Sequence, residues 1–290
     1  MPFLAILGHE LRSLWSSWLV RLWLAGTALL TFLLVASNWA QMPSSVLIAL
    51  VLLPYLIFPW CLIVMILGIS PVTGPRLDAL ADGILSRPVT RHEYLLASWA
   101  ARVAVVLTVY LAVMIPTMLI LRVAKRPVAD DGVTLYGILI ALTVVGVVLT
   151  FLVSLAFLVG TVLRRQMLAA VVLVFLWFPV NLVLHAFSLE ELSPISLTQA
   201  LPTVLKTPWR EMDGTTVATS QKDMDELTQQ AANFLSALST GSTPANQPPP
   251  KFFEDGDYED YSVFRVLCGY GLPALFAVGL ALLVFHRRDL

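Results

Sequence analysis

Few of the side chains that could do chemistry lie inside the long apolar segments of this chain. No Asp or Glu occupies the central part of any of these segments, and His9, His92 and His286 lie near segment ends. His185, near Asn181, is the single candidate for catalysis, although an isolated His there also fits an ordinary hydrogen-bonded residue at an interface. Buried carboxylates are typical of intramembrane enzymes and of ion-coupled transporters. Their absence disfavours both classes.

Arg102 is the one charge well within an apolar run. It lies 12 residues past Thr90, about 18 Å along a helix. If that helix starts in the cytoplasm, Arg102 lies near the inner interface. Two interpretations remain open. The guanidinium extends to the headgroups or contacts a lipid phosphate, or it has a gating or coupling role.

The chain lacks the other common signatures of catalysis and ligand binding. It has no G-x-x-x-x-G-K-[ST] loop and cannot hydrolyse ATP by that route. If it transports, a partner must supply the energy. Cys61 and Cys268 lie in separate apolar segments, which excludes a disulfide framework and a CxxC metal pair. We expect no cofactor and no metal.

Composition identifies an integral membrane protein. Hydrophobic residues make up 58% and charged residues 13% of the chain, and the mean hydropathy is +0.82. Soluble domains are about 45–50% apolar and about 25% charged. No basic tract suggests nucleic acid.

The pattern predicts an all-α fold with six transmembrane helices, because six apolar segments are near or above the ~20 residues needed to cross the bilayer. Prolines 54, 59, 116 and 179 predict kinks in the second, third and fifth segments. The segments are 19–38, 46–70, 91–121, 133–163, 167–187 and 264–285.

An N-terminal helix precedes the first of these segments. A helical stripe with polar residues mostly off it predicts an interfacial helix over residues 2–18 that lies in the headgroup plane. The alternative is a simple extension of the first span. The stripe consists of Phe3, Leu7, Leu11, Leu14 and Trp18.

The stretch of residues 75–102, PRLDALADGILSRPVTRHEYLLASWAAR, has a regular helical pattern. Apolar residues from Leu77 to Leu85 follow helical spacing and predict a short amphipathic helix at the membrane face. Arg87-Pro88 ends it, because proline biases the preceding residue away from helical angles. Thr90 to Glu93 has the form of a capping box and predicts the start of the third span.

This stretch resembles the loop between the second and third membrane helices of ABC-2 type transporter permeases. The family pattern is roughly "G-x-L-x-x-L-L-S" followed by "P-V-[ST]-R-x-E/x-Y/I-L-L-G-K". The departures are Ala97-Ser98 in place of Gly-Lys, and Asp78 and Asp82 in the lead-in. The matching residues are Gly83, Leu85, Ser86, Pro88, Val89, Thr90, Arg91, Tyr94, Leu95 and Leu96.

The resemblance implies a permease that pairs with a second permease copy and with a separate ABC ATP-binding subunit. It favours export as the direction of transport. Residues 76–93 would form the coupling helix that receives movement from the ATPase. An alternative is that these charges only anchor the loop at lipid headgroups. By the resemblance, polar contacts would come from Asp82, Arg87, Arg91 and Glu93, and Gly83 and Pro88 would set the shape.

Charge predicts the orientation. With the N-terminus inside, the cytoplasmic side receives ten arginines and five acidic residues, and the outer side receives 14 acidic and eight basic residues. By the positive-inside rule both termini are cytoplasmic, and the chain is expected in the plasma (inner) membrane. Arg122, Lys125 and Arg126 form the one positive short loop outside.

The resulting organisation has three parts: residues 1–187 with the first five spans, an extracytoplasmic region over 188–263, and residues 264–290 with the last span. In the middle part we expect short helices at the outer leaflet over residues 188–212 and an amphipathic helix over residues 220–239. A Pro-rich linker with an acidic patch is expected over residues 240–260. We expect this helical insertion to stand outside the core, where it can bind a partner protein. A second function class is therefore a non-transporting scaffold subunit, and a third is an enzyme using His185.

Overall fold

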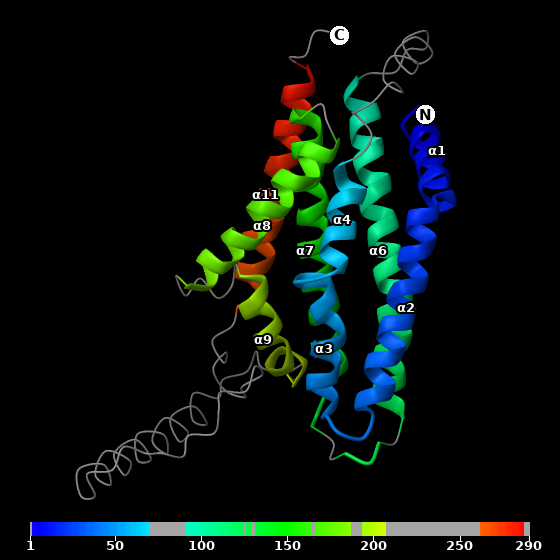
Figure 1. The fold of residues 1–290 in the computed structure, drawn as a ribbon, viewed down its shortest axis with the longest axis vertical. Helices are drawn as coiled ribbons and strands as arrows, with labels where there is room; N and C mark the ends of the chain where they lie inside the picture. The colour runs from blue at the N-terminus through cyan, green and yellow to red at the C-terminus, as the bar shows by residue number, and fades with distance from the viewer. Residues whose placement is uncertain are drawn as a thin grey trace, which may run out of the picture.

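The computed structural model describes residues 2–69, 91–124, 126–128, 131–163, 166–186, 193–206 and 262–286, and these residues form helices and no strands. The helices run mostly up and down one elongated bundle, and the start of α1 and the end of α11 lie at the same end (Figure 1). The helices are α1 Pro2–Ser16, α2 Trp18–Asn38, α3 Ser44–Leu56, α4 Trp60–Ile69, α6 Arg91–Val123, α7 Leu135–Val162, α8 Gln166–Ala186, α9 Pro194–Lys206 and α11 Val263–His286.

Five stretches of the described residues are long and apolar enough to cross a membrane: α2, α3 with α4, α6, α7 and α11. They match five of the six predicted segments closely in their bounds. The remaining segment forms α8, which has 21 residues, and the part whose side chains are described without a gap, Met167–Trp177, is an apolar helix shorter than a full span. α8 also leaves the bundle axis at an angle (Figure 1). The sixth crossing therefore stays a prediction.

The second span is broken in its middle. α3 ends at Leu56 and α4 begins at Trp60, with a cis peptide bond between Phe58 and Pro59. The expected effect of Pro59 is confirmed, whereas Pro54 lies inside α3. The thiol of Cys61 donates to the carbonyl of Ile57 at 2.7 Å, so one backbone group exposed by the break is satisfied locally.

α7 lies at the centre of the bundle and packs against α11, α4, α6 and α9. Thr134 caps its start, because the side-chain oxygen of Thr134 accepts a hydrogen bond from the backbone N–H of Gly137 at 2.9 Å. A Cβ at Gly137 would collide with the carbonyl oxygen of Leu205 in α9. Glycine at this position therefore allows α9 to lie directly on the first turn of α7.

α9 corrects the expectation that the whole outer region stands outside the core. The predicted short helix is present, but it packs against α3 and α7. Leu197, Leu201 and Leu205 belong to the main hydrophobic core. Pro194 is the first residue of this helix, and Pro202 lies within it without ending it. The predicted helix over 220–239 and the linker over 240–260 lie outside the described residues.

α1 packs against α6 and is separated from α2 by a non-helical residue, Ser17. The predicted stripe is the half-buried face of α1 from Phe3 to Leu14, whereas Trp18 is 76% exposed. The helix itself is confirmed. Its position in the headgroup plane stays a prediction.

At the opposite end of the bundle, Arg126 hydrogen-bonds to several residues of the α2–α3 turn. Its guanidinium donates to the carbonyls of Trp39 at 2.7 Å and Met42 at 2.7 Å, and to the hydroxyl of Ser44 at 3.0 Å. It also lies over the Trp39 ring at 5.4 Å from the centroid. This arginine, which the sequence marked only as a loop charge, joins the α2–α3 turn to the connection after α6.

Candidate functional site

The predicted coupling residues run from the segment that follows α4 into the first turn of α6. Asp82, Gly83, Arg87 and Pro88 are outside the described residues. The chain leaves α4 at Ile69 and enters α6 at Arg91, at the end of the bundle where α1 begins (Figure 1).

Two of the predicted residues belong to the start of α6. Arg91 is its first residue, which confirms the predicted start of the third span. Glu93 is half-buried in the first turn, where a carboxylate interacts favourably with the helix dipole. A coupling role for either residue stays a prediction.

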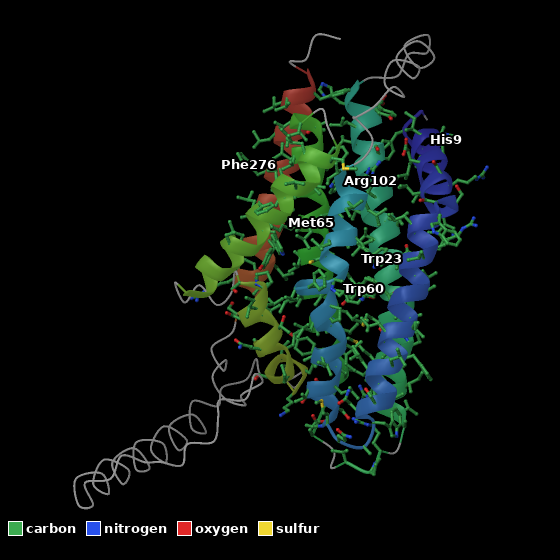
Figure 2. The ribbon with its side chains drawn as sticks, in the orientation of Figure 1. His9, Trp23, Trp60, Met65, Arg102 and Phe276 are labelled. Atoms are coloured by element: carbon green, nitrogen blue, oxygen red, sulfur yellow. The ribbon has the colours of Figure 1, made fainter. Side chains whose placement is uncertain are left out.

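Arg102 is buried near the end of α4, with 3% of its surface exposed (Figure 2). Its Nη1 donates a hydrogen bond to the carbonyl of Leu67. Leu67 lies in the last described turn of α4. This hydrogen bond therefore ties the side chain of Arg102 in α6 to the backbone of α4. The interpretation that its side chain extends to the headgroups does not fit this burial.

Glu10 of α1 and Tyr94 of α6 both interact electrostatically with Arg102. Glu10 lies on the half-buried face of α1 that packs on α6. A buried guanidinium needs such compensation, because an uncompensated charge removed from water is costly. Arg102, a residue of α6, therefore interacts with both α4 and α1.

Close backbone contacts hold the same end of α4 against α7. A Cβ at Gly68 would lie 2.6 Å from the Cβ of Ala156, and one at Gly160 would collide with the carbonyl oxygen of Ile69. One helical turn before Arg102, the indole N–H of Trp99 donates to the hydroxyl of Ser154 at 3.1 Å and ties α6 to α7. We call this set, with Glu10, Leu67 and Arg102, the α4–α6 junction.

The α4–α6 junction joins several helices at one end of the bundle. Arg102 bonds to the backbone of α4, Trp99 bonds to Ser154 of α7, and the electrostatic interaction with Glu10 adds α1. Among the described residues, no group of three or more His, Cys, Asp or Glu side chains could hold a metal ion.

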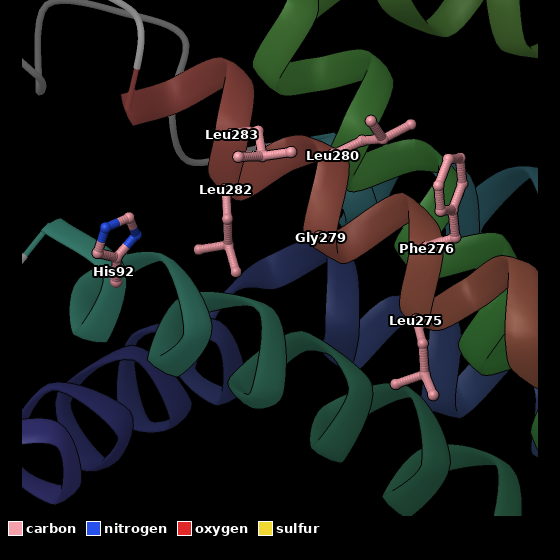
Figure 3. Close-up of a pocket in the computed structure, with 7 residues that line it drawn as sticks. All are labelled: His92, Leu275, Phe276, Gly279, Leu280, Leu282 and Leu283. Carbon is pink, nitrogen blue, oxygen red and sulfur yellow. The ribbon is translucent and has the colours of Figure 1, made fainter.

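A second feature at this end is an open groove of about 650 Å³ between the start of α6 and α11. Of its seven described lining residues, His92 is the polar one, and the six others come from α11, where Gly279 separates Leu275 from Leu282 (Figure 3). The side chain of His185 lies outside the described residues, so the structure leaves that candidate untested.

The sequence pointed to Arg102 but not to its partners. Glu10 appeared only as a polar residue beside a stripe, and a backbone carbonyl such as that of Leu67 leaves no signal in a sequence. Gly68 and Gly160 fall within apolar runs where glycine has many uses. Only the packing of α4 on α7 reveals their role.

Comparison with known proteins identifies the class of this bundle. No curated protein matches the chain. A family model described as ABC-2 family transporter protein matches residues 83–290, which is well over half of the chain. The match begins inside the predicted coupling stretch and includes every described helix from α6 to α11. The chain is therefore a multi-pass membrane component of transport, not itself catalytic, and it belongs to the ABC-2 transporter family.

Proposed function

We propose that this chain is the permease subunit of an ATP-driven exporter. Two copies form the translocation pathway, and a separate ATP-binding subunit drives them through residues 76–93. The chain lacks a phosphate loop, so ATP hydrolysis belongs to the partner. Asp82, Arg87, Arg91 and Glu93 supply the polar contacts, and Gly83 and Pro88 set the turn.

The observation that carries the proposal is the α4–α6 junction. The two ends of the coupling stretch attach to helices that are tied together by Arg102, by the Gly68 and Gly160 contacts and by the Trp99–Ser154 hydrogen bond. A segment that receives force needs such an attachment, because a loop on loosely packed helix ends would absorb the movement.

We propose that the protein lies in the plasma membrane with both termini in the cytoplasm. The arginine excess supports it. So does the position of the start of α1 and the end of α11 at one end of the bundle (Figure 1). An ATP-binding subunit in the cytoplasm then meets the coupling stretch directly.

The test is charge reversal in the coupling stretch, Arg87→Glu with Arg91→Glu. Lost charge-assisted contacts cost about 1.5–3 kcal/mol each when desolvated, so association with the ATP-binding subunit should weaken at least tenfold. Arg122→Glu is the matched control, because Arg122 is an exposed arginine at the far end of α6. Co-purification in mild detergent and ATP turnover of the complex are the measurements.

A well-folded double variant that keeps wild-type association and turnover would remove the coupling claim. The alternative, in which these arginines only anchor the loop at headgroups, has a different signature. It predicts lower membrane insertion or thermal stability, with ATP turnover per assembled complex unchanged.

A further inference from the structure

A second groove lies between α1 and α6. It has a volume of about 370 Å³ and is lined by Gly8, Leu11, Arg12, Trp15, Val105 and Thr108. A Cβ at Gly8 would meet nothing within 4 Å, so the missing side chain leaves this part of the groove open. Neither the coupling stretch nor the α4–α6 junction contributes any of these residues.

Helix lengths place the groove at the edge of the hydrocarbon layer. α2 has 21 residues, or about 31 Å, which matches the ~30 Å of hydrocarbon without any contribution from α1. The break at Ser17 therefore lies at the boundary. Trp15 and Trp18, on either side of the break, are 44% and 76% exposed, as expected for indoles at headgroup level.

The groove combines an apolar wall with a cationic edge. Leu11 packs on the core and Val105 is 3% exposed, whereas Arg12 is an exposed residue of the same groove. Arg21, also exposed, donates from Nε to the carbonyl of Trp15 at 3.5 Å and so adds a second cation next to it. An apolar surface at the edge of the hydrocarbon layer beside guanidinium groups is complementary to an amphiphile with an anionic head.

We propose that this groove binds one phospholipid with an anionic headgroup. Its phosphate accepts hydrogen bonds from Arg12, and an acyl chain lies against Leu11, Trp15 and Val105 in the space beside Gly8. The occupant is a bilayer lipid and not a second copy of the chain. This inference goes beyond the proposed function, because it holds whether or not the coupling stretch contacts an ATPase.

The test uses the full-length chain purified in detergent and equilibrated with phosphatidylglycerol or phosphatidylcholine, and native mass spectrometry counts the bound lipid. One arginine at a membrane surface changes affinity for anionic lipid by about fivefold. Arg12→Gln should therefore lose about fivefold for phosphatidylglycerol and little for phosphatidylcholine. Gly8→Leu, which fills the groove without a clash, should lose both lipids. Arg122→Gln, at the far end of α6, should behave as the wild type.

Three results would overturn the proposal. The wild type could retain both lipids equally, or Arg12→Gln and Arg122→Gln could lose lipid to the same extent. In the third, Trp15→Cys would form a disulfide between two copies in lipid-rich micelles, which would show that a second copy fills the groove. Because Arg12 is exposed and Gly8 faces open space, both variants should insert and fold.

Discussion

Replacing Arg102 by methionine should destabilise the α4–α6 junction by about 2–3 kcal/mol. The substitution removes a hydrogen bond from a charged donor, which contributes about 1.5–3 kcal/mol, and leaves the carbonyl of Leu67 without that donor. It also removes the positive charge that interacts electrostatically with Glu10. Methionine fills most of the space of the arginine stem, so no large cavity adds to the cost.

Thermal unfolding of the purified chain can measure this loss. In a protein of this size each kcal/mol corresponds to about 2–4 °C in Tm, so Arg102→Met should lower Tm by about 4–12 °C. Arg102→Lys is the matched control, because it keeps the charge and a donor and should lose less than half as much. A Glu10→Gln, Arg102→Met double variant should be more stable than the sum of the single losses predicts, since interacting residues are not additive.

The same variants separate a structural role from a coupling role. If the junction transmits force, Arg102→Met should still bind the ATP-binding subunit, because the coupling stretch is intact, but transport per ATP hydrolysed should fall. Arg102→Lys should restore most of it. An Arg102→Met variant with wild-type Tm, additive losses in the double variant and unchanged transport per ATP would refute the reasoning.

Three further outcomes are expected. Gly160→Ala should push α4 away from α7, because its Cβ collides with the backbone of Ile69, and cost about 1–3 kcal/mol in thermal unfolding; an unchanged Tm would show that the contact is loose. Single cysteines should report the topology: labelling of Ser86→Cys by an impermeant reagent outside intact cells would contradict a cytoplasmic coupling stretch, whereas Ser242→Cys should label. A short Gly/Ser linker in place of residues 213–250 should preserve membrane insertion and Tm while impairing function, because the replacement removes neither α9 nor any membrane segment. Failure of insertion would show that this stretch is structural.

The bounds of the membrane helices could be predicted because they follow the length of each apolar segment. The third segment was expected at 91–121 and α6 is Arg91–Val123; the fourth was expected at 133–163 and α7 is Leu135–Val162. A segment in lipid must satisfy its own backbone groups, so length and hydropathy specify helix with few alternatives.

The contacts between helices could not be predicted in the same way. Within a membrane domain both lipid-facing and buried positions are apolar, so the sequence of α4 does not show that Gly68 faces α7. The hydrogen bond from Arg102 to Leu67 joins a side chain to a backbone group, and every residue type carries such a group. α9 was placed outside the core because its polar residues resembled a surface segment, yet Thr198 is buried and donates to the carbonyl of Pro194 at 2.7 Å.

The break between α3 and α4 divides one membrane span between two packing units. One half, α3, packs mainly on α9, whereas the other half, α4, packs mainly on α7 and is followed by the predicted coupling stretch. A continuous helix would have to tilt as a whole and disturb its contacts with α9. If residues 57–59 act as a hinge, a change in a few backbone dihedral angles would let α4 swing while α3 stays in place. Movement at one face of the membrane then need not unpack the other.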